Sequence, residues 1–101
     1  MSYKIIITDG YFKKLKKFIK KHPDVLIRYE KIIKLLELDP YHPSLRLHQL
    51  KGDLKEYQSV SITMKYRVVI DFVIKENEII PIDIGTHDEV YWVVVIAKLV
   101  F

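Results

Sequence analysis

Histidine, lysine, arginine and tyrosine side chains recur at the ends of the apolar segments of this chain. The candidates for chemistry are His48, Lys51, Lys65, Arg67, His87 and Tyr91. Histidine transfers protons near neutral pH, and the planar guanidinium of arginine holds a phosphate through two hydrogen bonds. RNA can be cleaved without a metal because its own 2′-hydroxyl is the nucleophile, so a base, an acid and a cation suffice. The residue types are therefore sufficient for RNA cleavage, although they are not specific to it.

The same side chains also have structural roles open to them. Arg67 can pair with Asp71 or Asp83, which we expect on the same face of a sheet. His48 can be a hydrogen-bonding loop residue, and His87 can cap a helix. The residue types alone leave both interpretations open.

Two helices should follow a short first strand. Residues 3–8 are rich in β-branched side chains, and Thr8 or Asp9 can cap a helix over residues 11–21. Apolar residues recur there at helical spacing, and lysines fill the other face. Pro23 ends this helix and begins a second one over residues 23–38. Because the link is short, the two helices should form an antiparallel hairpin.

The apolar period changes to two after a polar loop, which predicts a β-meander. The predicted strands are residues 57–62, 66–74 and 79–85, with a turn at residues 63–65. Ile80, Ile82 and Ile84 should share one face, and Pro81 indicates either an edge strand or a local bulge. The fold class is therefore α+β, in the order β-α-α-β-β-β, with a helical hairpin on a small antiparallel sheet. In such a sheet His87 should come near Lys65 and Arg67.

Length and composition predict one domain over residues 1–101 in the cytoplasm. The chain has 101 residues, 50% of them apolar and none of them cysteine, which excludes disulfides and thiol chemistry. The longest apolar run is far below the roughly 20 residues that span a bilayer, so we expect no membrane contact. Residues 92–101 form an unusual apolar tail, for which a strand, a helix and a dimer surface all remain open.

Positive charge is concentrated in the first third of the chain. Residues 1–34 carry ten Lys or Arg against three acids, a net charge of +7, whereas the remainder carries seven against ten, or −3. This field suits RNA or an acidic protein partner, and a solvated lysine-rich helix face is the alternative. Phosphate-cradling glycine loops, nucleophile elbows and His-Glu-x-x-His motifs are absent from the sequence, and no metal or cofactor is expected.

The order of elements and two segments, LHQLKGDLKEYQSVSITMKYRVVIDFV and IDIGTHDEVY, resemble the RelE/ParE toxin superfamily of type II toxin–antitoxin systems. The RelE and YafQ branches are the most similar, over about residues 3–91. The resemblance implies a RelE-like fold in a small cytosolic toxin that cleaves mRNA in the ribosomal A site. It also implies a cognate antitoxin as partner.

The resemblance assigns roles to individual residues. His48 falls where the YafQ branch has a catalytic histidine, and His87 matches the histidine of its Gly-Thr-His ending. Tyr91 falls at the functional aromatic residue that follows. Arg67 falls where the RelE branch has a catalytic arginine, and Lys65 is a basic position of the kind such toxins use. The residues expected to bind RNA or the ribosome are Lys13, Lys16, Lys17, Lys20, Lys51 and Tyr66.

The sequence departs from the YafQ pattern at four positions. Ser61, Lys65 and Tyr66 stand where that branch has a histidine, an aspartate and a tryptophan. Asp83 stands where it has an arginine, which reverses a charge next to the expected phosphate site. An aspartate there can orient His87, or it can mark an altered enzyme.

Three hypotheses follow. The first is a ribosome-dependent mRNA endonuclease that uses no metal. The second is a ParE-like inhibitor of DNA gyrase, which does not need the two histidines. The third is a catalytically inactive relative that still binds an antitoxin, and Asp83 is its main support.

Overall fold

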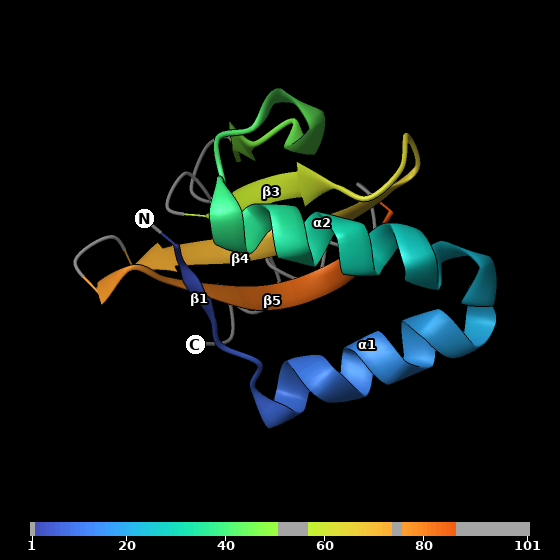
Figure 1. The fold of residues 1–101 in the computed structure, drawn as a ribbon. Coiled ribbons are helices and arrows are strands. Elements are labelled where there is room, and N and C mark those ends of the chain that lie inside the picture. The colour runs from blue at the N-terminus through green and yellow to red at the C-terminus, as the bar shows by residue number, and fades with distance from the viewer. Residues whose placement is uncertain (1, 51–56, 74–75, 87–101) are drawn as a thin grey trace.

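The computed structural model describes residues 2–50, 57–73 and 76–86 (Figure 1). The helices are α1, Asp9–Lys21, and α2, Leu26–Leu38, with 3₁₀ turns at Pro23–Val25 and Pro43–Leu45. The strands are β1, Lys4–Ile5; β2, His48–Gln49; β3, Gln58–Ser61; β4, Tyr66–Val73; and β5, Glu78–Thr86. This arrangement confirms the predicted α+β fold of a helical hairpin on a sheet.

Helix α1 has the predicted cap at Thr8 and the predicted end at Lys21, and it begins at Asp9, two residues before the predicted start. The Thr8 side chain accepts a hydrogen bond from the Tyr11 amide at 3.2 Å, which caps the helix. Asp9 in the first turn and Lys21 in the last complement the helix dipole. Pro23 then starts a 3₁₀ turn, after which α2 runs back to Leu38.

The sheet has five strands in the order β1-β5-β4-β3-β2. The pairs β2–β3, β3–β4 and β4–β5 are antiparallel, as predicted for the meander, but β1 pairs with β5 in parallel. The sheet is therefore mixed: the helical hairpin carries the chain from β1 at one edge to β2 at the other, and the meander then returns it to β5 beside β1. Helix α2 crosses in front of β4, and α1 runs along the outer side of β5 (Figure 1).

The main core lies between the helices and one face of the sheet. Its most buried members include Tyr11 and Leu36 from the helices and Val68, Ile70 and Ile79 from the sheet. A fully buried side chain of this size stabilises the fold by about 1.5–3 kcal/mol. Successive residues of a strand face opposite sides, so Val69 instead joins Leu50 in a second buried cluster.

Strand β5 contains a bulge that changes which of its residues face the core. Val69 lies opposite Asp83 while the next residue, Ile70, lies opposite Pro81, so Ile82 is the extra residue. The prediction that Ile80, Ile82 and Ile84 share a face is therefore wrong: Ile84 joins the main core, and Ile82 packs with Val69. The bulge expected from Pro81 is confirmed, and β5 is not an edge strand.

Within the described residues, neither helix has the length and apolar character needed to cross a membrane.

Candidate phosphate site on the exposed sheet face

His48 reaches the sheet through a strand that the sequence analysis missed. Arg46 ends the 3₁₀ turn with a left-handed backbone, at φ 49°, and directs the chain into β2. This conformation costs a non-glycine residue about 1–2 kcal/mol. His48 then pairs with Ser59 of β3, so the two side chains point to the same face of the sheet.

Arg67 lies on the same face, one strand further on. It is the second residue of β4 and lies directly opposite Ser61 of β3. Its Nη1 atom donates a hydrogen bond to the Ser59 hydroxyl at 3.1 Å and lies 3.2 Å from Nδ1 of His48. Three strands therefore bring His48, Ser59 and Arg67 into one cluster.

Either neutral form of His48 finds partners in this cluster. With the proton on Nδ1, the ring donates to the Arg46 carbonyl at 3.2 Å, and Nε2 accepts from Ser59 at 3.3 Å. With the proton on Nε2, the ring donates to Ser59, and Nδ1 accepts from Arg67. An imidazolium donates from both nitrogens and offers Arg67 no lone pair. Ser59 and the Arg46 carbonyl thus hold the ring in place in either neutral form.

The charge of Arg67 is not neutralised by an acid within the described part of the chain, where no carboxylate forms an ion pair with it. Burial, followed by the nearby positive charge of Arg46, lowers the pKa of the Arg67 guanidinium. Arginine nevertheless stays protonated at neutral pH. The Arg46 guanidinium is itself held against the sulfur of Met64 at 3.2 Å. A half-buried cation without a carboxylate partner is suited to an anionic ligand.

Lys65 and Tyr66 flank the cluster at the start of β4. The Lys65 ammonium lies over the Tyr66 ring, 5.4 Å from its centroid. The Tyr66 hydroxyl lies 3.3 Å from Nδ1 of His22, and the two rings are 4.8 Å apart. His22, predicted only to break a helix, therefore belongs to an aromatic group beside this end of β4.

Asp83 lies against helix α1. It is buried; its Oδ1 accepts from the Ile84 amide at 2.8 Å and lies 3.7 Å from the Lys14 ammonium. The sequence alternative in which Arg67 pairs with an acid is not the arrangement found, because Arg67 contacts Ser59 and His48. The lysines predicted to bind RNA or the ribosome, Lys13, Lys16, Lys17 and Lys20, are exposed on α1.

Three of the predicted residues, His87, Tyr91 and Lys51, lie outside the described residues. The end of β5 lies beside the start of β4, as predicted: Thr86 lies opposite Tyr66 and Gly85 opposite Arg67. Ser59 is the residue of this site that the sequence analysis missed. The sequence pattern that could have pointed to Ser59 is its place in an alternating strand, on the face opposite to Val60.

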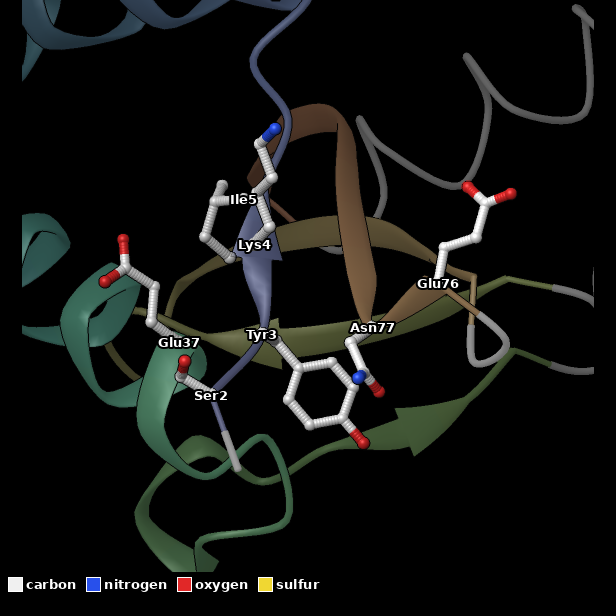
Figure 2. Close-up of a pocket in the computed structure, with 7 residues that line it drawn as sticks. All are labelled: Ser2, Tyr3, Lys4, Ile5, Glu37, Glu76 and Asn77. Carbon is white, nitrogen blue, oxygen red and sulfur yellow. The ribbon is translucent and has the colours of Figure 1, made fainter.

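A hollow of about 500 Å³ lies beside β1, at the end of the sheet away from Arg67 (Figure 2). Tyr3, Glu37, Glu76 and Asn77 are among the residues that line it. The two carboxylates extend away from each other, and the predicted site residues are not part of the lining. In the described ranges, no three histidine or acidic side chains are grouped so as to hold a metal ion.

Solved structures share this fold. YafQ from Escherichia coli BL21(DE3) is 16% identical, with a TM-score of 0.72, and the alignment covers 88% of this chain and 98% of that one. The YoeB/ParE toxin from Agrobacterium tumefaciens is 19% identical, with a TM-score of 0.69 and coverages of 83% and 98%. The toxin–antitoxin complex RelBE2 from Mycobacterium tuberculosis contains a chain that is 13% identical, with a TM-score of 0.65 and coverages of 86% and 100%. No protein-family model and no curated protein sequence matches the chain.

The chain therefore has the fold of the RelE/YafQ-like toxin superfamily, as the sequence resemblance predicted. At these identities the similarity is one of fold.

Proposed function

We propose that this protein is the toxin of a type II toxin–antitoxin system and cleaves mRNA on the ribosome. The observation that carries the proposal is the position of Arg67: a half-buried guanidinium, hydrogen-bonded to Ser59 and next to His48, without a carboxylate partner in the described residues. The similarity in fold to YafQ and to the RelBE2 complex supports the toxin role.

The proposed reaction uses the RNA itself as nucleophile. A histidine removes the proton of the 2′-hydroxyl, whose oxygen attacks phosphorus while the bond to the 5′-oxygen breaks, leaving a 2′,3′-cyclic phosphate. A second group returns a proton to the 5′-oxygen. Arg67 stabilises the negative charge that develops on the phosphoryl oxygens. No metal or cofactor takes part in these steps.

The residues take the following roles in the proposal. His48 and His87 are the proton-transfer groups, Lys65 adds positive charge, and Tyr91 positions or stacks a base. Lys51, Tyr66 and the exposed lysines of α1 bind RNA or the ribosome. The site of action is the cytoplasm, and the partners are mRNA, the ribosome and a cognate antitoxin.

The test is cleavage of mRNA on purified ribosomes by Arg67→Gln and His48→Gln variants. We expect Arg67→Gln to lower the cleavage rate by about 10²–10³-fold, the usual effect of removing a group that stabilises developing charge. The control is Lys34→Gln, which removes one positive charge from the exposed surface of α2 and should retain activity.

Two results would contradict the proposal. If Arg67→Gln cleaves mRNA at the wild-type rate, Arg67 does not stabilise the developing charge. Inhibition of DNA gyrase by the wild-type protein, with mRNA left intact, would instead assign the chain to the ParE-like alternative, which the similarity to the YoeB/ParE toxin also supports.

A further inference from the structure

A groove of about 530 Å³ lies between α1 and the C-terminal half of β5. Lys14, Lys17 and Lys21 line it from one face of α1 because they are spaced three and four residues apart. At a rise of about 1.5 Å per residue, this row of lysines is roughly 10 Å long. Phe18 and Ile84 contribute the apolar part of the lining.

Two of these lysines keep their full charge for a ligand. The Lys14 ammonium lies 3.7 Å from the buried carboxylate of Asp83, which offsets its charge. Lys17 and Lys21 form no ion pair with any carboxylate among the residues that the structure describes. Negative groups that enter the groove therefore meet Lys17 and Lys21.

The groove continues into an aromatic group. The Phe18 and His22 rings both belong to its lining, and each contacts the Tyr66 ring, with centroid distances of 5.1 Å and 4.8 Å. The Lys65 ammonium lies over the same tyrosine ring, and Arg67 is the next residue along β4. Cations and aromatic rings thus alternate from α1 towards the candidate phosphate site.

This alternation fits single-stranded nucleic acid, whose phosphates need cations and whose bases stack on rings. An acidic peptide would use the lysines but would have no use for the exposed part of the Tyr66 ring. Because Tyr66 and Arg67 point to opposite faces of β4, the nucleic acid would pass around the end of this strand.

We propose that the groove holds the single-stranded RNA that adjoins the phosphate bound at Arg67. Lys17 and Lys21 contact its phosphates, and Tyr66, held by His22, stacks against a base. The inference rests on the proposed RNA cleavage and adds the path of the substrate. Lys21 and His22 become substrate-binding and positioning residues, distinct from the outer lysines of α1.

The test compares two double variants that remove the same charge from exposed helix surfaces. Lys17→Gln/Lys21→Gln alters the groove, whereas Lys31→Gln/Lys34→Gln alters exposed lysines of α2 outside its lining. Binding of a fluorescent RNA strand of roughly ten nucleotides, made non-cleavable by 2′-O-methyl sugars, is followed by anisotropy over a range of salt concentrations. We expect the groove variant to weaken binding and to reduce the slope of log K against log salt by about 1.4, or about 0.7 per phosphate contact. The control variant should change that slope by less than half as much.

A third variant tests the stacking step. Tyr66→Leu keeps an apolar side chain but removes the flat ring, and it should weaken binding by about tenfold. If the two double lysine variants weaken RNA binding equally, the groove assignment is overturned. Displacement of the RNA by an acidic peptide at a lower concentration than by unlabelled RNA would assign the groove to a protein partner and overturn it too.

The binding assay tests the groove inference and the cleavage assay tests the proposed function, so each can be contradicted without the other. If the wild-type protein cleaves mRNA but both lysine pairs bind RNA alike, the groove inference is wrong and the proposed function stands. If the groove variant loses RNA binding but the wild-type protein cuts no mRNA on ribosomes, the proposed function is wrong.

Discussion

Arg67 is placed so that its charge is available to a ligand. A carboxylate within reach would pair with the guanidinium and compete with an incoming phosphate. Its described partners are a hydroxyl and an imidazole, which orient the side chain through Nη1 and leave the charge uncompensated. Ser59 is central to this arrangement because it contacts both His48 and Arg67.

Replacing Ser59 by alanine should lower cleavage without unfolding the protein. The variant loses two hydrogen bonds that orient the reactive groups, so we expect kcat to fall by about tenfold, equivalent to about 1.4 kcal/mol. Single-turnover cleavage on ribosomes measures this effect. Ser61→Ala is the matched control, since Ser61 lies opposite Arg67 but shares no hydrogen bond with it. Equal losses in the two variants would show that Ser59 acts only through packing.

The sequence predicted which residue types gather at this site better than it predicted how they are arranged. Histidine and arginine were recognisable from their residue types, and Arg67 from its place in an alternating strand. The contact between His48 and Arg67 depends on β2. This strand has only two residues, so the sequence shows no periodicity that would reveal it. Ser59 could not be selected because its diagonal relation to Arg67 requires the register of β3 on β4.

At the level of elements, a buried pair of tyrosines joins the two helices. The hydroxyls of Tyr11 in α1 and Tyr29 in α2 lie 2.8 Å apart inside the core. Burial, followed by the charge and hydrogen bond of Tyr29, raises the pKa of Tyr11 far above its ordinary value of 10.0. Burial also raises the pKa of Tyr29. Both hydroxyls therefore stay protonated in the folded protein at pH values where an unfolded chain would ionise them.

This pair should make the fold sensitive to alkali. Because the folded pKa values are raised, the stabilisation is complete below about pH 10 and declines as the pH rises further. Tyr11 should lower the free energy of unfolding by about 1.4 kcal/mol per pH unit there, and Tyr29 should act in the same direction. Urea denaturation at neutral and alkaline pH measures this slope. Tyr11→Phe/Tyr29→Phe should flatten it while changing stability little at pH 7, because both partners of the hydrogen bond are removed together. An unchanged slope would contradict this origin.

Local signals fixed the helices and the meander, but not the pairing of β1 or the faces of β5. The Thr8 cap and Pro23 act within a few residues, so the ends of α1 were predictable. The parallel pairing of β1 with β5 joins Lys4 to Glu78, and no local pattern encodes such a distant contact. The bulge at Ile82 shifts the strict alternation by one residue, which is why counting by twos placed Ile82 in the wrong cluster.

For the molecule as a whole, nine of the ten basic residues among residues 1–34 are divided between the two helices. On α1, Lys14, Lys17 and Lys21 line the groove, whereas Lys13 and Lys20 do not. On α2, Lys31 and Lys34 are also exposed. At physiological salt the field of an exposed charge decays over about 8 Å, so these groups of lysines can serve different parts of a large RNA target.

The outer lysines of α1 should determine how well the protein engages the ribosome. We expect Lys13→Gln/Lys20→Gln to raise the KM for ribosomes by about fivefold with kcat unchanged, since each exposed ion pair contributes up to about 1 kcal/mol and affects binding alone. Lys31→Gln/Lys34→Gln removes the same charge from α2 and should leave both constants as they are. Steady-state cleavage at several salt concentrations measures the difference, which should shrink as salt increases. A similar rise in KM for both variants would mean that net charge, rather than the outer face of α1, attracts the protein to ribosomal RNA.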